Sequence, residues 1–232
     1  MVEIKETIIK KTKKKTRLHK LKIILILIIL FLVNTYIILG IWYKGGNFTV
    51  TLDSEFGKES NLTIYEEYDK KHEKTYLKAK DIDFFTDISV DWLPENINNE
   101  AEGSHNGKNY IAHTFYAENQ GQETINYWVK IEIDDVVKNV DEAIRVMVYR
   151  NEEKKIYAKP NKVTYEAEKG TEKFYSDKIV MLNQVKDFTV NSKDKYTVVI
   201  WVEGDDPDCI DSLIGGEIKM HMTLTEEHIP NN

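Results

Sequence analysis

Hydrophobic and polar residues alternate along most of the chain after residue 47. The alternation is clearest in four segments, at 125–133, 144–148, 196–202 and 218–224. Successive side chains of a β-strand point to opposite faces, so each segment predicts a strand with one apolar and one polar face. Weaker strands are predicted at 48–52, 62–66, 76–80, 84–90, 110–117 and 162–167, and helical turns at 176–183 and 209–214.

Turn-forming residues separate many of the predicted strands, for example at 119–121, 168–170 and 191–192. About nine or ten short strands in one segment of this length are typical of two packed sheets. The sequence therefore predicts an all-β domain over residues 44–232, an antiparallel two-sheet sandwich of jelly-roll-like form. No internal repeat and no convincing linker divides this domain.

An uncharged apolar segment covers residues 23–43. At about 1.5 Å per residue these 21 residues span roughly 31 Å as a helix, which matches the hydrocarbon core of a bilayer. The segment is longer than the apolar part of a cleaved signal peptide and no small-residue cleavage site follows it, so an uncleaved signal-anchor is favoured over a cleaved signal. Its strongly polar members are Asn34 and Thr35. For Asn34, simple tolerance is favoured over a helix-pairing role.

Charge is distributed very unevenly along the chain. Residues 1–22 hold nine of the 32 Lys and Arg and two of the 39 Asp and Glu, a balance of +7. The remainder holds 23 basic and 37 acidic residues, a balance of −14. Because basic residues flank the cytoplasmic side of membrane spans, residues 1–22 are predicted inside and residues 44–232 outside. This interpretation is preferred to nucleic-acid binding, and no nucleic-acid partner is expected.

The most distinctive local feature is an acidic loop near the C-terminus. Carboxylates occur at Asp205, Asp206, Asp208, Asp211 and Glu217, and oxygen-rich loops of this kind can bind Ca²⁺. The spacing of an EF-hand is absent. The hypothesis of a calcium site therefore stands beside the simpler interpretation of a solvated acidic loop, which is favoured.

The sequence gives little reason to expect an enzyme. The chain has one cysteine, Cys209, and acidic neighbours that raise a thiol pKa surround it in sequence. The six histidines show no zinc-type spacing, and there is no nucleophile elbow, Walker loop or dinucleotide-binding glycine motif. We expect a non-catalytic protein without a cofactor, unless the acidic loop holds calcium.

Five segments carry a resemblance to known proteins. They are Tyr43-Lys-Gly-Gly-Asn-Phe-Thr-Val-Thr-Leu-Asp, Glu102-Gly-Ser-His-Asn-Gly, Phe115-Tyr-Ala-Glu-Asn-Gln-Gly, Val140-Asp-Glu-Ala-Ile-Arg-Val and Trp201-Val-Glu-Gly-Asp-Asp-Pro-Asp-Cys. On these segments the chain resembles an uncharacterised group of single-pass surface proteins of Gram-positive bacteria. More distantly, it is similar to the TasA and camelysin type of surface β-sandwich, which builds biofilm fibres. Those proteins have a cleavable leader ending in small residues, which this sequence lacks.

Three functions are compatible with these observations. The first, which is favoured, is a membrane-anchored module outside the cytoplasm that binds a cell-envelope or surface partner without catalysis. The second is a secreted matrix or fibre subunit that assembles through a sheet edge after leader cleavage. The third is a calcium-dependent or hydrolytic surface protein that uses the acidic loop at 203–217.

Overall fold

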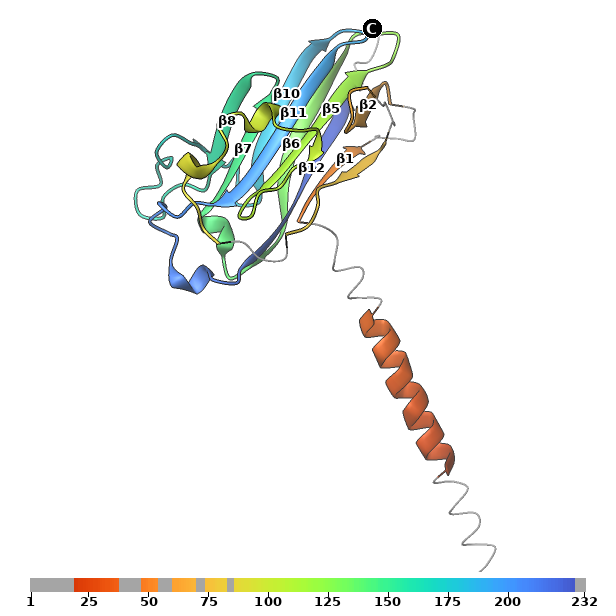
Figure 1. Ribbon diagram of the computed structural model, residues 1–232. Coiled ribbons are helices and arrows are strands. Elements are labelled where there is room, and N and C mark those ends of the chain that lie inside the picture. The colour runs from red at the N-terminus through yellow and green to blue at the C-terminus, as the bar shows by residue number, and fades with distance from the viewer. Residues whose placement is uncertain (1–18, 38–46, 54–59, 70–73, 83–85, 228–232) are drawn as a thin grey trace, which may run out of the picture. The chain divides into compact units, whose positions relative to one another are not determined.

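The protein is described by a computed structural model that covers residues 19–37, 47–53, 60–69, 74–82 and 86–227. The chain divides into two compact units, Met1–Gly45 and Gly46–Asn232. The first contains an apolar helix and the second a β-sandwich, so the expected fold class is confirmed (Figure 1). The predicted boundaries at residues 22 and 43 are not tested, and the second of them lies outside the described residues.

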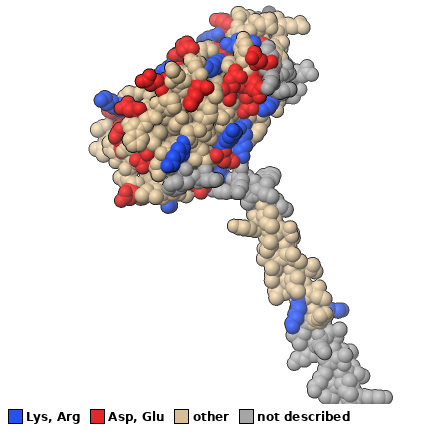
Figure 2. Space-filling model, in the orientation of Figure 1, with Lys and Arg blue, Asp and Glu red and all other residues tan. Residues whose placement is uncertain are grey.

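The apolar helix runs from His19 to Ile37 and is long and apolar enough to cross a membrane, a test that a signal sequence also passes. Residues 19–37 contain no Asp or Glu, and the face of the helix seen in Figure 2 is mostly uncharged. Inside the helix, Asn34 Nδ2 donates to the Leu30 carbonyl at 2.9 Å and Thr35 Oγ1 donates to the Phe31 carbonyl at 2.8 Å. Each of these bonds pairs one side-chain donor with a backbone carbonyl four residues earlier, as Ser and Thr commonly do within helices. Whether Asn34 also pairs helices stays a prediction.

One sheet of the sandwich has five strands in the order β10-β6-β12-β1-β3. Its central strands are long and alternate buried and partly exposed positions, as the period-two pattern requires. The strands are β1 (Phe48–Asp53), β3 (Tyr76–Lys78), β6 (Ile125–Val137), β10 (Ile179–Phe188) and β12 (Glu217–Glu227).

The other sheet follows the order β2-β5-β11-β7-β8-β9, and a short strand β4 also pairs with β5. Its central strand β11 (Lys193–Val202) is buried over most of its length, because both of its faces are covered. The remaining strands are β2 (Leu62–Tyr65), β4 (Gly103–Ser104), β5 (Ile111–Asn119), β7 (Ile144–Arg150), β8 (Glu153–Ala158) and β9 (Glu172–Lys173).

The pairing of strands departs from a purely antiparallel sandwich at two places. Strand β1 lies parallel to β12, with Phe48 opposite Met220, and β9 lies parallel to β8. Both sheets are therefore mixed. The parallel pair joins the first and last strands of the domain, a long-range pairing that alternation within either segment alone does not reveal.

Several local predictions were wrong. Residues 176–183 do not form a helical turn, because Ile179 begins β10. Residues 162–164 form a turn and residues 165–167 are irregular, so the strand predicted at 162–167 is absent. In the predicted strand at 84–90, the described residues contribute a single bridge, Ile88 to Glu203, before a short 3₁₀ helix η2 (Val90–Trp92). The turn expected at 209–214 is confirmed as the 3₁₀ helix η5 (Asp211–Leu213).

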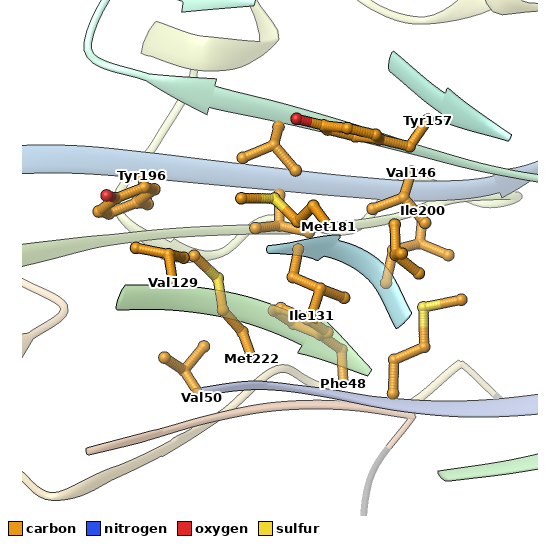
Figure 3. Packing of buried hydrophobic residues seen from close by; sticks show 14 of the residues in the cluster. Phe48, Val50, Val129, Ile131, Val146, Tyr157, Met181, Tyr196, Ile200 and Met222 are labelled. Atoms are coloured by element: carbon orange, nitrogen blue, oxygen red, sulfur yellow. The ribbon is translucent and has the colours of Figure 1, made fainter. Parts of the chain in front are cut away.

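A single large apolar core fills the space between the two sheets. Figure 3 shows Phe48, Val50 and Met222 from one sheet and Val146 and Ile200 from the other pointing into this layer (Figure 3). A smaller cluster packs on the outer face of the second sheet, around the fully buried Trp201. Burial of this core supplies the main stabilisation of the domain.

Candidate binding site at the loop between β11 and β12

The loop at 203–216 connects β11 to β12 and is fastened to the sandwich by a buried ion pair. Arg145 Nη2 lies 2.5 Å from Asp206 Oδ2, and both residues are about 5% exposed. Asp206 Oδ1 also accepts a hydrogen bond from the Asp208 amide at 2.7 Å. An ion pair taken out of water in this way requires good geometry, and removing one partner leaves an unpaired buried charge. Asp206 therefore holds the base of the loop.

Glu203 forms a second fastening point at the end of β11. Its Oε2 accepts hydrogen bonds from Trp201 Nε1 at 3.0 Å and from the Val90 amide at 3.2 Å. The neighbouring Ser89 hydroxyl donates to Asp205 Oδ2 at 2.8 Å. These hydrogen bonds connect the loop to the segment around Ile88, which is far away in sequence. The start of the loop is thus rigidly positioned.

The structure distributes the five predicted calcium ligands instead of gathering them. Asp206 is buried against Arg145, Asp205 bonds to Ser89, and Asp208 Oδ1 lies 3.5 Å from Lys162 Nζ. Asp211 begins η5, and Glu217 is exposed at the start of β12. In the part of the chain that the structure describes, no group of three or more His, Cys, Asp or Glu side chains is placed to hold a metal ion.

Beside these acidic residues the loop encloses a pocket of about 320 Å³. One wall is apolar, and its outer members Ile210 and Ile214 are 58% and 66% exposed. Gly204 also lines the pocket, and a Cβ added there would lie 2.7 Å from Asp87 Oδ2. A side chain at that position would therefore displace the Asp87 carboxylate. The lining comprises Thr86, Asp87, Val140, Val202, Gly204, Cys209, Ile210, Asp211, Leu213, Ile214, Gly215 and Gly216.

The charged groups of the pocket are carboxylates. Asp87 and Asp211 both line it, and no Lys or Arg of the described residues forms an ion pair with either of them. The nearby Lys138 Nζ donates to the Ile214 carbonyl at 2.6 Å and so secures the rim. The pocket therefore combines an exposed apolar wall with two available negative charges, which suits an apolar group that carries a positive charge.

The Cys209 thiol lines the same pocket, but its environment makes it a weak nucleophile. Burial raises its pKa, and the carboxylates of Asp87, Asp206 and Glu203 raise it further. A nucleophilic thiol needs the opposite environment, with a cation or a base that favours the thiolate. The expectation from sequence that acidic neighbours would raise this pKa is confirmed.

We predict slow alkylation of Cys209 for this reason. At pH 7.5 iodoacetamide should modify it more slowly than a cysteine in an unstructured peptide, since burial and the neighbouring carboxylates leave less thiolate. Mass spectrometry of the intact protein over time measures the rate. Asp87→Asn should accelerate the reaction by removing the charge that raises the pKa most strongly. A wild-type rate equal to that of the peptide would contradict this account.

Comparison with known proteins adds little to this picture. No protein-family model matches the chain, and no curated protein matches it. Among solved structures, selenomethionine-labelled β-glucosidase from Kluyveromyces marxianus is 13% identical over 73% of this chain, with a TM-score of 0.27. The same enzyme in complex with glucose is 12% identical over 69% of this chain, with a TM-score of 0.23. The match spans 17% and 15% of those chains, so neither similarity carries an argument.

Sequence reasoning found the acidic loop but missed its partners. Arg145 lies on β7 and Asp87 precedes the bridge at Ile88, so neither is near the loop in sequence. The only signal in the sequence is the pair of isoleucines at 210 and 214. The structure shows that both are exposed and that they flank the short 3₁₀ helix. Isolated exposed apolar residues are common, so two isoleucines alone do not identify a pocket.

Proposed function

We propose that this protein is a single-pass membrane protein whose β-sandwich domain lies outside the cytoplasm and binds a partner without catalysis. The main support for partner binding is the pocket at the β11–β12 loop, with its exposed Ile210 and Ile214 and the carboxylates of Asp87 and Asp211. Contiguous exposed apolar residues beside charged groups are typical of interaction sites. The partner that fits is a protein segment presenting a basic side chain next to apolar ones.

The membrane topology in this proposal rests on the N-terminal segment. The helix at His19–Ile37 has the length and composition of a membrane span, and the basic residues of the chain's first 22 positions precede its apolar part. Positive residues favour the cytoplasmic side, which places the sandwich on the other side. The absence of catalysis is supported by Cys209, whose raised pKa makes it a poor nucleophile.

Topology is tested by protease treatment of intact cells that express the full chain with a C-terminal epitope. We expect the epitope to be removed from full-length, membrane-bound protein. A product shortened by the leader and found in the medium would contradict the anchor and favour a secreted, assembling subunit. An epitope protected in intact cells would contradict the outward orientation.

Binding at the pocket is tested in the same cells by photo-crosslinking. A photoreactive residue at position 214 should give a discrete adduct, whereas one at position 163, where Val163 is 86% exposed, should give none. The double variant Asp87→Asn and Asp211→Asn should weaken the adduct, because it removes the charges that attract a basic side chain. Equal adducts at 163 and 214, or an adduct insensitive to both carboxylates, would contradict the proposed site.

A further inference from the structure

A second cavity lies between the two sheets at one side of the sandwich. There β10 is the end strand of the five-stranded sheet, and β8 is followed by only the two-residue strand β9. The cavity measures about 230 Å³. Val129 and Met181 line it from one sheet, and Val148, Tyr157 and Tyr196 line it from the other. Figure 3 shows Met181 in the layer between the sheets together with Val129, Tyr157 and Tyr196.

The volume of this cavity is large enough for a ring or a short alkyl chain. An engineered cavity of about 150 Å³ with apolar walls stays dry and binds benzene. The present cavity is larger and its floor is built from the same kind of side chain, with Val185 of β10 completing it. It is partly open to solvent and Arg150, Glu153 and Lys155 also line it, so a ligand can enter from the surface and find polar groups beside the apolar floor. The cavity therefore offers apolar binding space that the protein's own side chains leave open.

The two cations that line the cavity, Arg150 and Lys155, already form ion pairs. Arg150 Nε and Nη2 lie 2.9 and 2.8 Å from Asp194 Oδ2, and Lys155 Nζ lies 3.1 Å from Glu172 Oε1. An anionic ligand would have to compete with Asp194 and Glu172 for these cations, and a cationic ligand would lie beside Arg150 and Lys155. An uncharged hydroxyl or amide does not displace either pair. It can accept a hydrogen bond from the Arg150 guanidinium and donate one to the Glu153 carboxylate, both of which line the cavity.

A buried hydrogen-bond network fixes the Arg150 guanidinium in position. Asp194, which is 3% exposed, also accepts hydrogen bonds from the Tyr127 hydroxyl and from Asn151 Nδ2. The Tyr127 hydroxyl lies 2.9 Å from that of Tyr196, which lines the cavity. Because these partners hold Asp194 rigidly, the guanidinium needs little reordering when a ligand arrives.

We propose that this cavity binds a small uncharged amphiphile, with a ring or short alkyl body among the valines and Met181 and a hydroxyl or amide head at Arg150 and Glu153. This site is separate from the pocket of the β11–β12 loop and does not depend on the function proposed above.

Methionine methyl NMR of the full chain in lipid nanodiscs tests the proposal. The chain has five methionines; Met181 lines the cavity, and Met147 lies in the cluster on the outer face of the second sheet. Titration with benzyl alcohol should shift the Met181 signal in a saturable manner and leave the Met147 signal in place. The probes benzoate and benzylammonium, of similar shape but charged, should bind about tenfold or more weakly.

Two filling variants separate binding in the cavity from partition into lipid. Val148→Phe fills the space from β7 and Val185→Phe fills it from β10, so each should abolish the Met181 shift while the melting temperature confirms folding. Val163→Phe, at an exposed position, should retain it. Unsaturable shifts, or shifts of Met147 equal to those of Met181, would overturn the cavity as a site. Equal or tighter binding of a charged probe would overturn the assigned ligand class.

Discussion

Asp206→Asn should lower the unfolding free energy of the β-sandwich domain by about 3–5 kcal/mol, because it leaves the buried Arg145 guanidinium without its counter-charge. Both side chains are almost completely inaccessible, so water cannot replace the lost carboxylate charge. Urea unfolding of the full chain in lipid nanodiscs, followed by tryptophan fluorescence, measures the difference. Trp201 is a suitable reporter, because it is buried and its indole N–H bonds to Glu203 in the same region.

Matched variants show whether the ion pair itself is responsible. Asp211→Asn changes an exposed acid of the same loop and should alter the free energy by less than about 0.5 kcal/mol. Removing both charges, with Arg145→Met and Asp206→Leu, should recover much of the loss, since no unpaired charge remains. If Asp206→Asn is destabilising only when Ca²⁺ is present, the carboxylate is a calcium ligand and this account is wrong.

The acidic loop shows why composition alone does not establish a metal site. Its carboxylates are close in sequence, yet Asp206 turns inward to Arg145 of β7 while Asp205 bonds to Ser89. Which acids share a coordination sphere depends on loop conformation and on distant partners. Neither is encoded in the spacing of Asp and Glu along the loop. The sequence therefore locates the feature but not its chemistry.

The sandwich was predictable because its core strands obey the simple alternation of buried and exposed side chains. In β12, buried and accessible positions alternate along its whole length. Strand β10 was missed for a physical reason, since its pairing with β6 shifts register between Ile179 and Met181 and again between Val185 and Phe188. Each irregularity breaks the period of two that identifies a strand. The pairing partners were beyond prediction, because alternation fixes faces and not neighbours.

Titration of His113 should lower the unfolding free energy of the domain by about 3 kcal/mol as the pH falls from about 6.5 to about 4. This residue of β5 is completely buried, and neither ring nitrogen has a hydrogen-bond partner among the residues that the structure describes. Burial lowers its pKa to about 4; the carboxylate of Glu66, 3.4 Å from Nε2, opposes the shift, while His105 and Lys74 add to it. Sequence reasoning placed His113 on a strand but did not identify it as a core residue.

The direction of the effect follows from which state binds the proton more tightly. In the unfolded chain the imidazole has its ordinary pKa near 6.5. Between that pH and about 4, the unfolded state binds a proton that the folded state does not bind. The contribution of His113 to stability is therefore complete above pH 7 and falls as the pH drops. It levels off near pH 4, where the folded protein is protonated as well.

Unfolding free energies of the wild type and of His113→Leu, measured from pH 7.5 to 3.5, isolate this contribution, because the other titrating groups largely cancel in the difference. The leucine variant should lack the loss of about 3 kcal/mol that the wild type shows between pH 6.5 and 4. Glu66→Gln removes the carboxylate that favours the charged imidazole, so its His113 should protonate at a still lower pH and the loss should continue below pH 4. Parallel pH profiles for wild type and His113→Leu would show that the imidazole is solvated and titrates normally.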